Sequence, residues 1–247
     1  MTHKTKGIIL RTIKYGETSL VVTIFTELFG VQTYMINGVR TAKRSGAKAV
    51  LYQPAAVLDM EVYHNDLKGM QRIKESSWEM IHHHIFSDVI KNSIALYMVE
   101  LLYKSLKQPE QNTDLFYFCE DAFTQLDSAD NNIAANLPLY FALHLTHFFG
   151  FRINNTLPTH LSQHIFLDLI EGNFTNEQPI HPHFIQGENA IITSELLNIM
   201  QVHELEQVKL NGVKRRELLL KYHDYYALHI QDFGKMKTLQ VLHEILS

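Results

Sequence analysis

Four basic residues close together are the strongest candidates in this sequence for binding a charged ligand. The four are Arg40, Lys43, Arg44 and Lys48. No acidic residue lies between Leu28 and Leu58. Basic side chains of this kind neutralise phosphates and release counterions, so the segment is predicted to bind the backbone of a nucleic acid. Arg11, Lys14 and Arg72 would extend the basic surface if they lie on the same face. The alternative interpretation is an ordinary solvated loop.

Aromatic side chains near these cations could stack on bases, as they do in proteins that bind single strands. The candidates are Tyr15, Phe29, Tyr34 and Tyr52. For each of them, packing inside a small barrel or at its rim is the competing interpretation.

Four histidines offer a second possible chemistry. They are His160, His164, His181 and His183. One pair has the spacing of a helical turn and the other is His-x-His, with Asp168 as a possible oxygen ligand, so a zinc ion could be held there. The alternative is a set of surface histidines in a polar loop. We favour that alternative and predict no metal and no cofactor. The His82–His84 run is a weaker candidate, because adjacent side chains on a helix point in different directions.

Motifs of catalytic sites are absent from the sequence. There is no glycine-rich phosphate loop, no Gly-x-Ser-x-Gly and no His-Glu-x-x-His. The single cysteine, Cys119, falls on the apolar side of a predicted helix, which favours a core residue over a catalytic thiol. We therefore predict that the protein is not an enzyme.

Composition narrows the class further. The chain has 247 residues, of which 46% are hydrophobic and 19% are charged, so it can bury a full core. No run approaches the roughly 20 apolar residues of a membrane span, and the first residues lack a signal-peptide core. We expect a cytoplasmic protein that contacts no membrane. One cysteine also excludes a disulfide scaffold.

The net charge of −4 conceals a division of the chain. Residues 1–58 carry eight basic and two acidic side chains, a net charge of +6, which leaves −10 for the remainder. Such an asymmetry indicates a nucleic-acid contact on the basic side.

The hydrophobic pattern changes near residue 80. Before it, short β-rich runs separated by turn signals predict a small five-stranded barrel. The predicted strands are Gly7–Lys14, Leu20–Thr26, Val31–Ile36, Ala56–Tyr63 and Gly69–Ser76. After it, apolar residues recur at three- and four-residue steps, which predicts helices. The predicted helices are Ile85–Lys107, Leu115–Leu126, Leu137–Phe149, Thr193–His203, Gly212–Phe233 and Lys237–Leu246. Between 152 and 188 the periodicity fails, and we predict an irregular insert.

The residues of the N-terminal part resemble the bacterial DNA repair protein family RecO. The resemblance rests on a series of short motifs in a fixed order. These are Lys6–Arg11, Tyr15–Val22, Phe25–Gly30, Asn37–Arg40, Leu51–Pro54 and Gly69–Glu75. Each motif is weak alone, but their order and spacing over some 75 residues are specific. The helical part matches more loosely, at Tyr97–Leu102 and Leu143–Phe151.

The resemblance implies an α+β fold, with a five-stranded OB-fold barrel at residues 1–79 followed by an all-helical domain at 80–247. It implies a mediator of homologous recombination in the cytoplasm, associated with the nucleoid. Such a protein binds single- and double-stranded DNA, anneals complementary strands and, with RecR, helps to load RecA onto DNA coated by the single-strand-binding protein SSB.

The resemblance also assigns roles to particular residues. It places DNA contacts at Arg40, Lys43 and Arg44, and less directly at Lys6, Arg11, Arg72, Lys235 and Lys237. We further predict that the acidic tail of a partner is anchored by Arg215, Arg216 and Lys221, although these residues also suit a solvated helix start. Many members carry a four-cysteine zinc module, and here the insert 152–188 stands in its place without cysteine.

Two other functions stay open at this point. One is a metal-assisted hydrolase that uses the histidines of the insert. The other is an adaptor whose helical domain recruits proteins while the barrel binds RNA or nothing.

Overall fold

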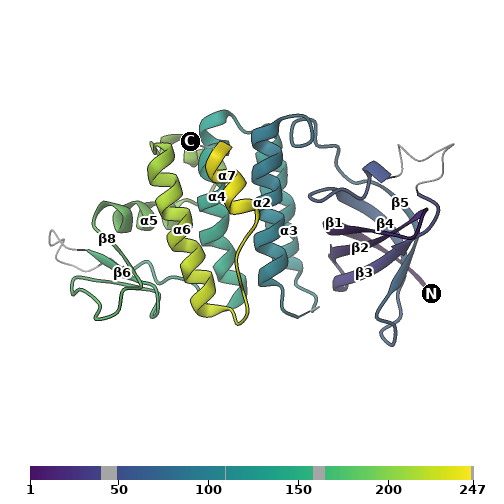
Figure 1. Ribbon diagram of the computed structural model, residues 1–247, viewed down its shortest axis with the longest axis horizontal. Helices are drawn as coiled ribbons and strands as arrows, with labels where there is room; N and C mark the ends of the chain where they lie inside the picture. Colours follow the sequence, from purple (N-terminus) through teal and green to yellow (C-terminus); the bar gives the residue numbers. More distant parts are fainter. Residues whose placement is uncertain (40–48, 109, 158–164, 246–247) are drawn as a thin grey trace. The chain divides into compact units, whose positions relative to one another are not determined.

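The computed structural model describes residues 1–39, 49–108, 110–157 and 165–245 (Figure 1). The predicted contacts at Arg40, Lys43, Arg44 and Lys48 therefore lie outside the described residues. Contacts group the chain into two compact units, one of Met1–Ser87 with Leu106–Asp127 and one of Asp88–Ser105 with Ser128–Ser247. The predicted division at residues 79 and 80 stays a prediction, because grouping by contacts does not show which segment folds alone.

The first unit is built on a closed five-stranded barrel. Its strands are β1 (Thr2–Tyr15), β2 (Ser19–Thr26), β3 (Gly30–Ile36), β4 (Val57–Tyr63) and β5 (Gln71–Trp78). The strand order is β1-β2-β3-β5-β4, with β3 and β5 parallel and the other pairs antiparallel. This confirms the predicted barrel.

Strand β1 is longer than predicted, because it serves two neighbours. Its first half pairs with β4, from Thr2 opposite Tyr63 to Ile8 opposite Val57. Its second half pairs with β2, and a bulge between Ile9 and Arg11 marks the change. Such bulges bend a strand and let a barrel close. The charged residues before Gly7 hid this first half from a search for apolar runs.

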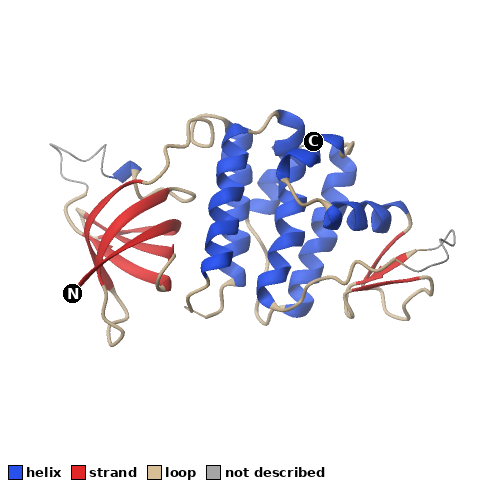
Figure 2. Ribbon diagram, turned by 180° about the vertical axis from the view of Figure 1, so that it is seen from behind, coloured by secondary structure: helices blue, strands red, loops and turns tan. Residues whose placement is uncertain are grey.

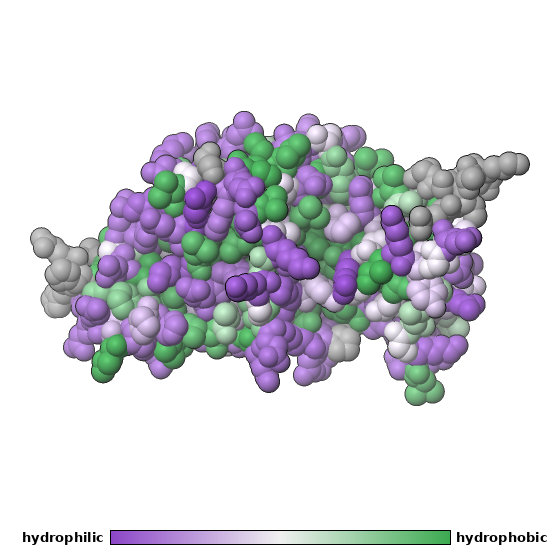
Figure 3. Space-filling model, in the orientation of Figure 1, coloured by the Kyte–Doolittle hydropathy of each residue, from purple (hydrophilic) through white to green (hydrophobic). Residues whose placement is uncertain are grey.

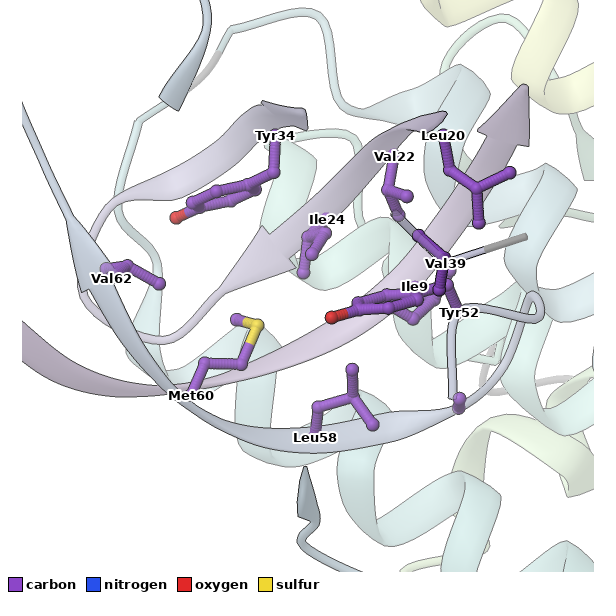
Figure 4. Packing of buried hydrophobic residues seen from close by; sticks show 11 residues of the cluster. Ile9, Leu20, Val22, Ile24, Tyr34, Val39, Tyr52, Leu58, Met60 and Val62 are labelled. Atoms are coloured by element: carbon purple, nitrogen blue, oxygen red, sulfur yellow. The ribbon is translucent and has the colours of Figure 1, made fainter. Parts of the chain in front are cut away.

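The barrel core follows from alternation along each strand. Every second residue points inward, and the inward set is apolar (Figure 4). On β4, Leu58, Met60 and Val62 face the core, whereas Asp59 and Tyr63 are exposed, as the pattern predicts. Each fully buried side chain of this size contributes roughly 1.5–3 kcal/mol.

Gly7 marks the tightest approach inside the barrel. A Cβ built there would lie 2.3 Å from Met60 Cε and 2.6 Å from Ile24 Cγ2. We expect Gly7→Ala to lower the free energy of unfolding by about 1–3 kcal/mol, as added atoms do in a filled core. Gly69→Ala is the matched control, because a Cβ there meets no atom within 4 Å. Urea denaturation of both variants measures the difference, and equal losses would contradict this account.

Helix α3 (Thr113–Ser128) packs on the outside of the barrel. The Phe116 ring lies 5.7 Å from the ring of Phe25 on β2. Cys119 is fully buried in this helix, which raises the pKa of its thiol and fits a core residue. The sequence suggested Asp114 as the N-cap. The structure corrects this, because Asn112 Oδ1 accepts the hydrogen bond from Leu115 N at 2.9 Å.

The second unit is mainly helical, as predicted (Figure 2). Its helices are α2 (Val89–Ser105), α4 (Asn131–Leu145), α5 (Glu188–Asn198), α6 (Gly212–His229) and α7 (Thr238–Ile245). Helix α4 contacts α2, α5 and α6, and ten of its fifteen residues are buried, which confirms its predicted central place. Among the described residues, no helix has both the length and the hydropathy that crossing a bilayer requires.

The start of α4 differs from the prediction. Helix α4 begins at Asn131, so Pro138 lies inside it rather than in its first turn. The side chain of Asp130 accepts hydrogen bonds from the backbone N–H groups of Asn132 and Ile133, and this cap sets the helix start. A short 3₁₀ helix, η1 (Thr146–Phe149), follows and ends at Gly150, whose φ of 80° is left-handed.

The insert contains a small antiparallel sheet where the hydrophobic periodicity gave no signal. Its strands are β6 (Phe166–Asp168), β7 (Asn173–Thr175) and β8 (Phe184–Gln186), in the order β7-β6-β8. Three residues are too few to show alternation, so the sequence could not reveal these strands. A second 3₁₀ helix, η2 (Val202–Gln207), follows α5 where the sequence had extended that helix to His203.

Candidate nucleic-acid interface

Two of the predicted DNA-binding cations lie on the outer face of the barrel. Arg11 on β1 stands opposite Thr23 on β2, and Arg72 on β5 stands opposite Met35 on β3. These positions alternate with the inward residues Val22 and Tyr34, so both guanidinium groups point away from the core. Both arginines are exposed.

Lys6 has a different environment from the one predicted for a DNA contact. Its Nζ lies 3.0 Å from Glu79 Oε1 and 3.0 Å from Glu120 Oε1. Burial alone would lower the pKa of Lys6, but the hydrogen bonds to Glu79 and Glu120 outweigh it and raise the pKa. In this structure the ammonium group therefore fastens α3 to the barrel.

A cavity of about 690 Å³ opens where β3 and β5 meet. The two strands pair at Tyr34–Gln71 and Met35–Arg72, so this seam of the barrel is short. The floor and rim combine apolar, basic and acidic side chains. The apolar residues include Val39, Leu51, Tyr52, Met60 and Ile73, the basic ones are Lys4, Arg72 and Lys74, and the acidic ones are Asp59, Glu61 and Glu75.

The rim of the cavity is balanced in charge, so by itself it attracts no polyanion. Lys74 Nζ lies 2.9 Å from Glu61 Oε1, which neutralises one basic residue. However, the segment 40–48 leaves the described chain at Val39 and returns close to Leu51, and both residues line the cavity. The four cations of that segment are thus tethered to this side of the barrel.

Sequence reasoning missed Lys4 and Lys74 at this rim. The signal was present in the alternation of β1 and β5, since Lys4 stands opposite Glu61 and outside the core. It was overlooked because the first residues of β1 were not assigned to a strand.

The predicted aromatic platforms divide between core and surface. Tyr34 and Tyr52 belong to the barrel core, and the Tyr52 hydroxyl lies 2.7 Å from Ser76 Oγ. Phe29 is half-buried and stacks on His64, with ring centroids 3.9 Å apart. Tyr15 is 58% exposed, so of the four it offers the most open ring.

The remaining predicted DNA contacts lie in the second unit. Lys235 and Lys237 are exposed in the segment before α7. The backbone N–H of Lys237 donates to Glu100 Oε1 at 2.9 Å, which fixes this segment on α2.

The three predicted partner anchors lie on α6. Arg215 is half-buried and donates to the carbonyl of Leu210 at 2.6 Å, and burial lowers its pKa. Arg216 donates to the carbonyl of His243 at 2.9 Å. Lys221 is partly exposed. The two arginines therefore hold backbone carbonyls of their own unit.

The histidine cluster is only partly described. His160 and His164 lie outside the described residues. His181 Nε2 is 3.1 Å from Asp168 Oδ2, and the His183 ring lies beside His181. Within the described ranges, no three His, Cys, Asp or Glu side chains are grouped as metal ligands would be. The metal site stays a prediction, which metal analysis of the purified protein can test.

Comparison with known proteins gives a consistent result along the chain. Residues 1–81 match the family model described as Recombination protein O N terminal, and residues 87–156 match Recombination protein O C terminal. The DNA repair protein RecO of Flavobacterium psychrophilum is 32% identical over 249 residues, covering 100% of both chains. The RecO of Phocaeicola vulgatus is 30% identical over 247 residues, again covering 100% of both.

Proposed function

This chain belongs to the RecO family of DNA repair proteins, and from that premise we propose that it is a recombination mediator that binds single- and double-stranded DNA on its barrel. In this proposal it anneals complementary strands and, with RecR, helps to load RecA onto DNA coated by SSB. The work is done by binding and release, in the cytoplasm at the nucleoid, and no covalent bond is broken.

One observation carries the proposal. The basic segment 40–48 is tethered at the β3–β5 cavity, on a barrel whose outer face also presents Arg11 and Arg72. Small barrels of this kind bind single strands by combining a basic groove with exposed rings.

The proposed mechanism of annealing is electrostatic. Cations that neutralise phosphates release condensed counterions, so binding depends on salt and tolerates any sequence. Two strands held on such a surface repel each other less than in solution, which lets complementary bases meet. The second unit carries the acidic part of the sequence, and this disfavours DNA there except at Lys235 and Lys237.

We also keep the proposal that α6 contributes to partner binding. Arg216 and Lys221 present positive charge beside apolar residues of the same helix, which suits an acidic peptide with an apolar end. Because Arg215 is turned onto Leu210, we rank it below the other two as an anchor.

The test is a titration of a labelled single strand at several salt concentrations, read by fluorescence anisotropy. The triple variant Arg40→Ala, Lys43→Ala, Arg44→Ala should bind about tenfold more weakly. Its log–log salt slope should flatten by about 2, since each phosphate contact on a single strand contributes ~0.7.

A second triple variant controls for net charge. Arg152→Ala, Lys209→Ala and Lys221→Ala removes the same charge from the second unit and should keep the wild-type slope. If both triple variants behave alike, the basic segment is not the DNA site. If the wild-type protein binds no DNA, the mediator function itself is wrong and a protein adaptor replaces it.

A further inference from the structure

The turn between β4 and β5 is held rigidly by the side chain of Gln71. Gln71 is buried, and its Nε2 donates to the carbonyls of Asn65 and Lys68 at 2.9 and 2.7 Å. Its Oε1 accepts a hydrogen bond from Asn65 N at 3.0 Å. Leu67 N donates to Asn65 Oδ1, and Lys68 N donates to the Asn65 carbonyl. Five hydrogen bonds thus fix a four-residue turn.

This fixed turn exposes apolar side chains. Leu67 at its tip is 95% exposed, and Met70 is 40% exposed. In Figure 3 hydrophobic atoms form the end of the projection that the β4–β5 loop makes in Figure 1. A single exposed leucine needs no explanation, but a leucine held forward on a turn with no freedom to fold back is suited to enter an apolar gap.

The base of the hairpin carries an aromatic ring beside a cation. Tyr63 on β4 stands directly opposite Arg72 on β5, and cross-strand partners share a face. The Tyr63 ring is 48% exposed, and Arg72 also lines the β3–β5 cavity. The hairpin therefore continues the candidate nucleic-acid interface.

The carboxylates of the hairpin are turned away from this face. Asp66 Oδ1 lies 2.8 Å from His64 Nε2, and Glu61 is paired with Lys74. Glu75 faces Lys74 as well. Lys68 at the tip adds an exposed positive charge. A polyanion can thus approach the tip without meeting an uncompensated carboxylate.

We propose that the β4–β5 hairpin is a wedge, in which Leu67 inserts between two neighbouring bases of a bound single strand while Tyr63 and Arg72 hold the next nucleotide. Apolar side chains open base steps in this way in other DNA-binding proteins, and rings with cations hold unstacked bases. The inference rests on the proposed function. It adds a role, because an opened step presents the pairing edges of its bases to a complementary strand.

The experiment uses a single strand of adenines that contains 2-aminopurine, whose fluorescence rises when its neighbours unstack. Saturating wild-type protein should raise the fluorescence. Leu67→Ala should lose most of this rise and bind about fivefold more weakly, because the apolar contact with the bases is gone. Leu67→Met should keep both properties, because methionine retains the apolar reach.

Met200→Ala is the matched control, since Met200 is also apolar and 74% exposed but lies in the second unit. It should leave both signals unchanged. The wedge is wrong if Leu67→Ala keeps the full fluorescence rise, even if that variant loses a protein partner instead. Wild-type anisotropy on the same strand separates the two failures: binding without a fluorescence rise rejects the wedge alone, and no binding rejects the proposed function with it.

Discussion

An Asp127→Ala variant is expected to lose about 3 kcal/mol of unfolding free energy, because this carboxylate fastens the chain where it leaves the barrel. Asp127 Oδ1 accepts hydrogen bonds from the backbone N–H groups of His84 and Ile85 at 2.7 and 2.8 Å. Its Oδ2 accepts from the N–H of His83 at 2.9 Å. Each bond to a charged acceptor contributes roughly 1.5–3 kcal/mol when dry. Ile85 is buried but the two histidines are exposed, so water replaces part of the loss.

Two measurements test this expectation. Urea denaturation gives the loss of stability, and hydrogen exchange should show faster exchange at His83, His84 and Ile85. Asp130→Ala is the matched control, because Asp130 caps α4 with two exposed hydrogen bonds and should cost about 1 kcal/mol. If the two alanine variants lose equal stability, the three bonds of Asp127 are not the stabilising contact that we describe.

The pH dependence of this contact has a defined sign. Burial alone would raise the pKa of Asp127, but the backbone hydrogen bonds from Ile85, His84 and His83 hold the pKa below its ordinary range. A lowered folded pKa means that the contribution is complete above the unfolded pKa, about 4, and is lost as the pH falls through the folded value. The Asp127→Ala variant should therefore lose part of the acid sensitivity below about pH 4.

The barrel was predictable because its information is local. Alternation on β4 separates Met60 from Asp59, and the turn before Gly30 is readable from neighbouring residues. The helical unit was predictable for the same reason, since α4 is apolar on nearly every side. Caps were less predictable. Both Asn112 and Asp114 suit the start of α3, and the sequence does not show which side chain reaches Leu115 N.

The candidate site was harder to predict, because it depends on partners distant in sequence. Lys6 has the residue type of a phosphate contact, yet Glu120, 114 positions later, holds its ammonium group. Arg215 is likewise taken by Leu210. In contrast, Leu67 drew no attention as a lone apolar residue in a loop. Its rigid exposure becomes visible only when the Gln71 side chain is seen to close the turn.

A Glu100→Ala variant is expected to release the C-terminal segment, because this carboxylate of α2 holds the start of α7. Glu100 Oε2 accepts hydrogen bonds from Thr238 N at 2.8 Å and Thr238 Oγ1 at 2.7 Å, and Oε1 accepts from Lys237 N at 2.9 Å. A negative charge at a helix N-terminus adds a favourable interaction with the helix dipole. We expect the free energy of local opening to fall by about 3 kcal/mol.

Hydrogen exchange of the amides between Met236 and Leu242 measures this release. Their protection should fall by roughly a hundredfold in Glu100→Ala, which corresponds to about 3 kcal/mol, and by less in Glu100→Gln, which keeps one acceptor oxygen. Glu195→Ala, at an exposed site on α5, should leave the protection unchanged. Unchanged protection in Glu100→Ala would show that α7 is held by its apolar packing alone.

Acid should release the same segment in the wild-type protein. Burial alone would raise the pKa of Glu100, but the hydrogen bonds from Thr238 and Lys237 lower it below its ordinary value. The contribution is thus complete above the unfolded pKa, about 4.3, and is lost as the pH falls through the folded value. Because Lys235 and Lys237 lie on this segment, Glu100→Ala also tests whether they contact DNA. A single strand should bind with a salt slope flatter by ~0.7 for each phosphate contact that the released segment gives up.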